Sequence, residues 1–222
     1  TRGLPIFSEK PPGTRTEDAA HLAKSINVPN VVAFNRRYIP LNERFKGIVD
    51  AMDSIYFMEG HFLRHQRPDE TFMIGTGIHW INFIEWVLGE IAEVETERFR
   101  DPADAAWARV ARLRFRSGLR GLLKVLPMTG ADHERLEVHS MAQSVYLEGP
   151  LWTHSGQIIL ERGGEREVIL PEGTGDTPVS RGIVGEYEDF FRAVCHGTPT
   201  RSNFQNAANS MRIAARSKPH AQ

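Results

Sequence analysis

Two short segments carry side chains that suit chemistry on a hydroxyl or carbonyl group. The first is Glu9-Lys10-Pro11, which follows an apolar run at residues 4–8. An ammonium group at a strand end can donate a hydrogen bond to a substrate oxygen, or relay a proton when burial lowers its pKa. A solvated lysine beside the strand end is the alternative interpretation.

The second segment, residues 75–79, reads Gly-Thr-Gly-Ile-His and opens an apolar stretch that runs to Leu88. A neutral imidazole at His79 can accept the proton of an alcohol while the carbon loses hydride. Asn82 lies three residues further on, on a neighbouring helix face, and is a candidate substrate ligand. A core histidine hydrogen-bonded to the backbone would give the same pattern.

A third candidate lies between these two segments, in Asn35-Arg36-Arg37-Tyr38. The guanidinium groups of Arg36 and Arg37 suit a carboxylate, a phosphate or sugar hydroxyls of a substrate. Salt bridges between two halves of the chain explain them equally well.

The elements that must position these groups fall into two parts. Residues 4–8, 16–26 and 31–34 predict a strand, a helix and a strand, which together form a βαβ unit of a parallel sheet. Ligands of such sheets bind at the carboxyl ends of the strands, and Lys10 stands at one. We therefore interpret residues 1–36 as a remnant of a dinucleotide-binding domain.

The remaining part, residues 37–222, predicts an α+β domain with helices on one face of a large, mainly antiparallel open sheet. Helices are expected at residues 41–52 and 78–88, from Ser180, and from Asn203. Strands are expected at residues 54–63, 91–98, 107–116, 119–126, 136–140, 144–147, 157–161 and 165–170.

Composition excludes several classes of protein. The formal net charge of −1 over 222 residues argues against a nucleic-acid binder. No apolar run reaches the roughly 18 to 20 residues needed to cross a bilayer. The single cysteine, Cys195, suits a reducing compartment, so we expect a cytoplasmic chain. His61 and His65 lack a nearby third ligand, and no metal site is predicted.

Together, the three segments resemble the glucose–fructose oxidoreductase / inositol dehydrogenase family, and the run from Glu186 to Ala215 is similar to that family's closing helices. The resemblance implies NAD or NADP as cofactor, held in part by Glu9, Lys10 and Pro11. It also implies a sugar, cyclitol or related polyol as substrate, with Lys10 and His79 as catalytic residues, and a homodimer or tetramer formed through the sheet face.

The chain departs from that family in two places. Gly75 stands where the family's dehydrogenases usually have an aspartate, four residues before the histidine. No G-x-G-x-x-G follows a strand, so the phosphate-binding turn is expected upstream of Thr1, in a longer protein. Two alternatives stay open for the chain: a non-catalytic binding or assembly subunit, and a hydrolase or lyase that uses NAD for transient oxidation.

Overall fold

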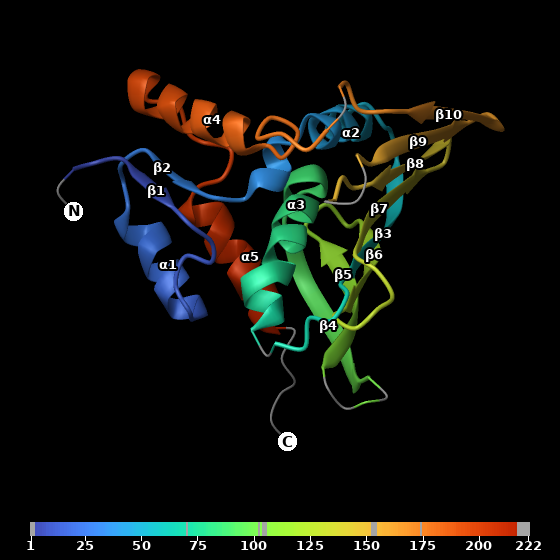
Figure 1. Cartoon of the computed structure of the whole chain (residues 1–222), viewed down its shortest axis with the longest axis horizontal. Helices are drawn as coiled ribbons and strands as arrows, with labels where there is room; N and C mark the ends of the chain where they lie inside the picture. Colours follow the sequence, from blue (N-terminus) through green and yellow to red (C-terminus); the bar gives the residue numbers. More distant parts are fainter. Residues whose placement is uncertain are drawn as a thin grey trace.

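The computed structural model describes residues 3–69, 71–101, 103, 106–151, 155–173 and 175–216. The chain forms a small βαβ unit and a large sheet with helices between them (Figure 1). The fold class predicted from the sequence is confirmed. Within the described residues, no helix combines the length and the apolar character that a membrane crossing requires.

The βαβ unit consists of β1 (Ile6–Ser8), α1 (Thr16–Ser25) and β2 (Asn30–Val32). The two strands pair in parallel, with Phe7 opposite Val31. Acidic side chains stand in the first turn of α1, where the helix dipole favours negative charge. The parallel pairing directs the carboxyl end of β1, and with it Lys10, toward the rest of the chain.

The large sheet has eight strands in the order β10-β9-β8-β7-β3-β6-β5-β4. All neighbours pair antiparallel except β3 and β6, which are parallel. The strands are β3 (Ile55–Leu63), β4 (Ile91–Arg100), β5 (Trp107–Phe115), β6 (Arg120–Leu126), β7 (His133–Ser140), β8 (Gln143–Glu148), β9 (Gln157–Arg162) and β10 (Glu165–Ile169).

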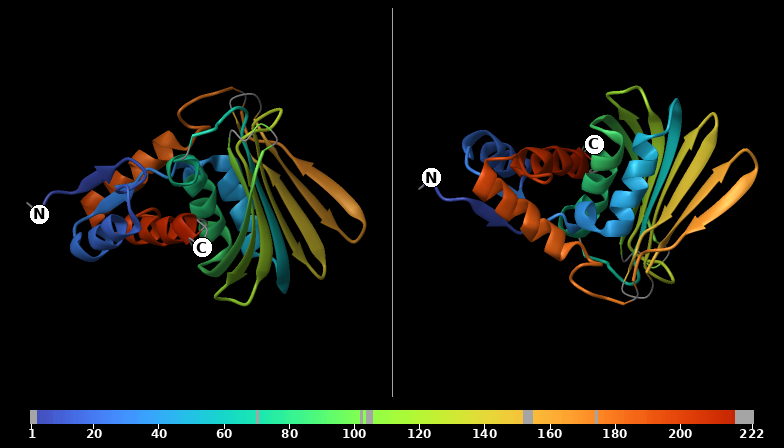
Figure 2. Two further views of the ribbon diagram at one scale, coloured as in Figure 1. Left: turned by 90° about the horizontal axis from the view of Figure 1, so that it is seen from below. Right: turned by 90° about the horizontal axis from the view of Figure 1, so that it is seen from above.

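Helices α2 (Pro40–Asp50) and α3 (Ile78–Leu88) lie on one face of this sheet (Figure 2). Their apolar side chains pack on the inward residues of the strands, with Phe45, Trp80 and Ile84 almost fully buried. Among the described residues, no helix covers the opposite face of the sheet (Figure 2).

The last helix, α5 (Phe204–Arg216), connects the two parts of the molecule. It packs against both α1 and α3. A second apolar cluster joins Ala19 and Val32 of the βαβ unit to Ile78 of α3 and Met211 of α5. Residues near both ends of the chain therefore hold the carboxyl end of β1 beside the start of α3.

Helix α4 (Ile183–His196) docks against the 3₁₀ helix Asn35–Tyr38 (η1) through a glycine. Ser180, the expected cap, bonds instead to Thr177 within the preceding turn, and Gly182 precedes the helix with φ of 74°. A Cβ on Gly182 would collide with the backbone of Asn35 and Tyr38. The close approach of two backbones explains why glycine stands there.

We expect Gly182→Ala to lower the free energy of unfolding more than Gly197→Ala does. The difference should be about 1–3 kcal/mol, the usual cost of an overpacked site. Gly197 has a similar φ of 68°, but a Cβ added to it would meet no atom within 4 Å, so it carries only the left-handed backbone cost. Urea denaturation of both variants measures the difference. Equal urea midpoints for the two variants would show that η1 can move to accommodate the added Cβ with little loss of stability.

Candidate functional site

The sequence around His79 folds as a π-helical segment, Met73–Gly77 (η2), that runs directly into α3. The amide of Ile78 donates to the carbonyl of Met73, five residues earlier. Segments of π-helix inside α-helices occur frequently at functional sites. Here the wider turn places the carbonyl of Gly75 beside Lys10, whose Nζ donates to it over 2.5 Å.

Lys10, Arg36 and His79 line one cavity of about 830 Å³. Arg64 and Arg67, which follow β3, and Thr76 of η2 line it as well. Loops that follow β8 and β10 also line it, with described residues such as Leu151, Glu172 and Ser180. The structure thus brings together one candidate residue from each of the three segments singled out in the sequence.

His79 is partly buried, and its Nδ1, which is shielded from solvent, has no hydrogen-bond partner among the described residues. The ring meets Phe34 edge to face, with the centroids 5.6 Å apart. Burial lowers the pKa of His79 well below 6.5, and the charges of Arg36, Lys10 and Arg64 lower it further. The imidazole is therefore neutral at physiological pH and can accept a proton.

Lys10 lies half-buried at the carboxyl end of β1, before a cis peptide bond to Pro11. Burial lowers the pKa of its ammonium group, and the nearby charges of Arg36 and Arg67 act in the same direction, against Glu9. The carbonyl that accepts the hydrogen bond from its Nζ is neutral. Lys10 can therefore donate to a ligand oxygen in the cavity and release a proton more readily than an ordinary lysine.

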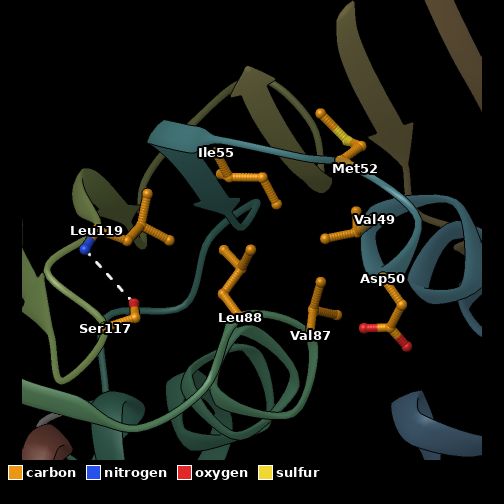
Figure 3. Close-up of a pocket in the computed structure, with 8 residues that line it drawn as sticks. All are labelled: Val49, Asp50, Met52, Ile55, Val87, Leu88, Ser117 and Leu119. Carbon is orange, nitrogen blue, oxygen red and sulfur yellow. Dashed lines mark hydrogen bonds between the residues drawn. The ribbon is translucent and has the colours of Figure 1, made fainter. Parts of the chain in front are cut away.

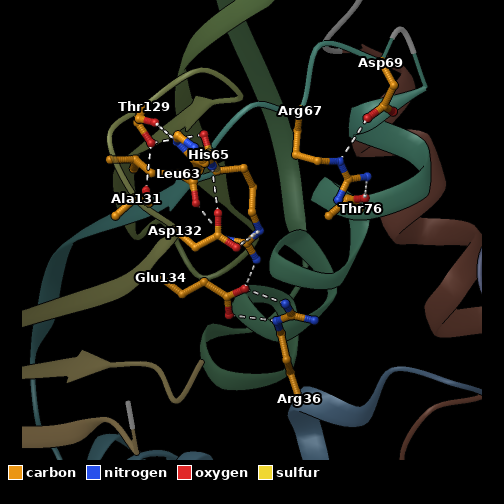
Figure 4. A network of polar contacts seen from close by, with 11 residues as sticks. Arg36, Leu63, His65, Arg67, Asp69, Thr76, Thr129, Ala131, Asp132 and Glu134 are labelled. Carbon is orange, nitrogen blue, oxygen red and sulfur yellow. Dashed lines mark hydrogen bonds and ion pairs between the residues drawn. The ribbon is translucent and has the colours of Figure 1, made fainter. Parts of the chain in front are cut away.

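The carboxylate of Glu134, which lies almost fully buried on β7, pairs with Arg36 (Figure 4). It also pairs with Arg64. Arg36 Nε donates to Glu134 over 2.9 Å, and Arg64 also stacks on the Phe62 ring at 3.8 Å. Burial raises the pKa of Glu134, but the two guanidinium groups outweigh it, so that the pKa is lowered overall. Glu134 therefore stays ionised and fixes both arginines at the cavity.

The other candidates from the sequence lie outside the cavity lining. Arg37 is buried and donates from Nε to Asn82 Oδ1 over 2.6 Å. Asn82 in turn donates to Ser210, which bonds to Glu85. These contacts tie η1, α3 and α5 together, so Arg37 and Asn82 hold the scaffold of the site. Glu9 and Pro11 flank Lys10 but do not line the cavity.

Polar residues of the site that were absent from the sequence-based candidates include Arg64, Arg67 and Asp132, which line the cavity, and Glu134. Glu134 had a recognisable signal, because strand alternation places it on the same inward face as Leu136 and Val138. A carboxylate on an apolar face needs a buried partner. One of its two partners, Arg64, follows a strand 70 residues away, and no local sequence pattern marks Arg64 as that partner.

Elsewhere, the described residues offer little for catalysis. A smaller cavity of about 270 Å³ between α2, α3 and the β5–β6 turn has mainly apolar lining, with Asp50 as its only charged lining residue in the described part of the chain (Figure 3). His61 bonds to Glu59 and His65 to a backbone carbonyl. No group of three or more potential metal ligands occurs within the described ranges.

Glu186, on α4, is buried close to Glu9, and its Oε1 has no hydrogen-bond partner among the described residues. Burial and the charge of Glu9 raise its pKa to about 8. A raised carboxyl pKa means that the folded state binds a proton that the unfolded state has released. The contribution of protonated Glu186 to the stability of the fold is therefore complete below pH 4.5 and is lost as the pH rises through about 8.

We therefore expect Glu186→Gln to stabilise the protein at pH 9 by about 1–3 kcal/mol, the cost of an unsatisfied buried polar group, and to change little at pH 5. Thermal unfolding at both pH values measures this. Glu188→Gln, on an exposed position of the same helix, is the control and should be neutral at both. A Glu186→Gln effect that is equal at pH 5 and pH 9 would contradict the assignment.

Comparison with known proteins supports the same architecture. Neither a known family profile nor a curated protein matches the sequence. Among solved structures, a dehydrogenase from Chromobacterium violaceum superposes with a TM-score of 0.85 at 18% identity, covering 97% of this chain and 68% of that one. UDP-N-acetylglucosamine 3-dehydrogenase from Acidithiobacillus ferrooxidans gives 0.79 at 16% identity, covering 96% and 69%.

Levoglucosan dehydrogenase, solved with NADH and levoglucosan, also matches, with a TM-score of 0.79 at 17% identity and coverage of 96% of this chain and 70% of that one. The fold is thus that of a large part of such dehydrogenases. The resemblance to the glucose–fructose oxidoreductase / inositol dehydrogenase type, suggested by the three sequence segments, is confirmed for the fold.

Proposed function

We propose that the intact protein is an NAD(P)-dependent oxidoreductase that transfers hydride to or from a sugar, cyclitol or related polyol. The observation that carries this proposal is the cavity shared by Lys10 and His79, which come from separate elements. Burial keeps the imidazole neutral and lowers the pKa of the lysine, as acid–base work near neutral pH requires. The fold shared with dehydrogenases adds support.

In the proposed reaction, the substrate hydroxyl lies between the two side chains. As the carbinol carbon loses hydride, the hydroxyl proton passes to the imidazole of His79, and Lys10 donates a hydrogen bond to the same oxygen. Bound nicotinamide supplies the hydride acceptor. In this chain, Glu9, Lys10 and Pro11 would hold the nicotinamide, because they follow the carboxyl end of a strand in a parallel pair.

The first experiment is the intact mass of the purified protein, followed by a fluorescence titration with NADH and NADPH. If the purified protein has a mass above 25.1 kDa and binds NADH or NADPH, the result supports the proposal. Screening should then start with polyols, following the formation of reduced cofactor. If a protein that carries a complete nucleotide-binding half binds neither cofactor, the proposal fails.

We also propose that the protein forms a homodimer or tetramer through the open sheet face. This face carries mainly charged pairs, such as Lys124–Glu59 and Arg135–Glu137, beside the rings of Phe57 and Tyr146. Tyrosine and arginine are enriched at interfaces. We expect light scattering to give a dimer or tetramer at micromolar concentration, and Phe57→Lys to weaken it; a monomeric wild-type protein would contradict this.

A further inference from the structure

The end of the cavity beside His79 carries an excess of positive charge. Lys10, Arg36 and Arg64 all line it, and all three charges lower the pKa of His79. Of the acidic residues that line the cavity, Asp176 pairs with Arg181, and Asp132 lies beside Arg64. Neither Asp132 nor Asp176 pairs with Lys10 or Arg36, so positive charge is in excess beside His79.

Carboxylates among the described residues compensate these cations only in part. Arg36 and Arg64 share one buried carboxylate, that of Glu134. Asp132, the next acidic group, lies 3.9 Å from Arg64 and is one-third exposed. Figure 4 shows one guanidinium nitrogen of Arg36 directed away from Glu134, and this nitrogen makes no hydrogen bond with a described residue.

Lys10 makes no salt bridge within the described part of the chain, although Glu9 acts on it at longer range. Its Nζ is held by the carbonyl of Gly75, at the position where the family resemblance implies an aspartate. A neutral carbonyl orients the ammonium group without cancelling its charge. The site therefore keeps a cation that an aspartate would have neutralised.

We propose that the substrate carries its own anionic group, a carboxylate or phosphate, close to the hydroxyl that reacts, and that Lys10, Arg36 and Arg64 bind this group. The inference rests on the proposed function and narrows its substrate class from polyols in general to acidic ones, such as sugar acids or sugar phosphates. The remaining guanidinium donors and the Lys10 ammonium group suit both anions, because charge-assisted hydrogen bonds to carboxylate or phosphate are stronger than neutral ones.

Calorimetric titration of the purified protein with matched pairs of ligands tests this directly. D-gluconate is compared with D-glucitol, and D-glucose 6-phosphate with D-glucose. We expect the acid of at least one pair to bind about tenfold to a hundredfold more tightly than its neutral partner, the usual value of a charge-assisted hydrogen bond. A larger ratio of affinities for the gluconate pair would indicate a carboxylate substrate, and a larger ratio for the glucose 6-phosphate pair would indicate a phosphate.

Two variants of Gly75 separate the charge from the shape of the site. A Cβ there would lie 3.8 Å from Thr71 Oγ1, an ordinary contact, so the Cβ of either Gly75→Asp or Gly75→Asn adds no clash with that side chain. Gly75→Asp adds a carboxylate near Lys10 and should lower the preference for the acid at least about tenfold, the value of one charge-assisted hydrogen bond. Gly75→Asn is nearly the same size but neutral, and should keep the preference.

The outcomes separate this inference from the proposed function. If acid and neutral ligand bind equally, or if Gly75→Asp and Gly75→Asn behave alike, the anionic substrate is wrong while the oxidoreductase proposal stands. If none of the ligands binds in the presence of NADH but the cofactor does, the inference is overturned as well. Absence of cofactor binding by an intact protein would instead overturn the proposed function.

Discussion

Replacing His79 with glutamine is expected to lower the turnover of the intact protein by about 100-fold to 10,000-fold, the usual contribution of a general base. Glutamine is similar in size and polar, but it cannot accept a proton in this pH range. Lys10→Met should have an effect of similar size, because it removes the group that donates to the reacting oxygen. Steady-state assays with the substrate found by screening measure both.

The histidine at position 196, at the exposed end of α4, provides the matched control, since His196→Gln changes the same residue type far from the cavity lining. It should leave turnover unchanged. Full turnover by both His79→Gln and Lys10→Met would remove the catalytic assignment. The alternative, a binding or assembly subunit, would then be preferred.

The pH dependence gives a separate test of His79. Its lowered pKa means that the imidazole loses its proton well below pH 6.5, so the acid limb of kcat/KM should also lie well below 6.5. The same shift has a consequence for stability, because the unfolded state binds a proton that the folded state excludes. Stability should therefore fall as the pH drops below 6.5, and less so in His79→Gln. An acid limb above pH 6.5 would contradict this.

Local patterns are sufficient to predict the fold class and most elements. Alternation identifies the strands of the sheet, and the apolar stretch ending at Gly89 marks α3 correctly. Lys10 is placed correctly because a βαβ unit determines where a strand's carboxyl end points. The shared position of Lys10, Arg36 and His79 at one cavity depends on knowing a similar family, because periodicity alone does not bring distant segments together.

The start of β7 shows where local patterns fail. Alternation predicts the strand from Leu136, but it begins at His133, because Glu134 interrupts the apolar residues on its inward face. The partners of Glu134 come from η1 and from the end of β3, far away in the sequence. The π-helical turn at Gly75 is equally hidden, since its departure from α-helix involves one extra residue and leaves the pattern of apolar residues nearly unchanged.

Loss of the Glu134 carboxylate should also destabilise the fold strongly. Glu134→Gln would leave Arg36 without an ion-pair partner among the described residues and Arg64 with only the more distant Asp132, and removing one partner of a buried ion pair costs about 3–5 kcal/mol. That is a large share of the total stability of a typical domain, about 5–15 kcal/mol. Urea denaturation should show a clear fall in the midpoint, and cavity ligands should bind less well because Arg36 and Arg64 lose their anchor.

Glu137→Gln is the matched control for Glu134→Gln. Glu137 lies on the same strand but on the open face, where it pairs with Arg135, a partly exposed partner. Exposed pairs contribute about 0–1 kcal/mol, so this variant should unfold almost like the wild type. If the two variants lost equal stability, Glu134 would be no more than an ordinary surface partner, and its assignment as the group that fixes both arginines at the cavity would fail.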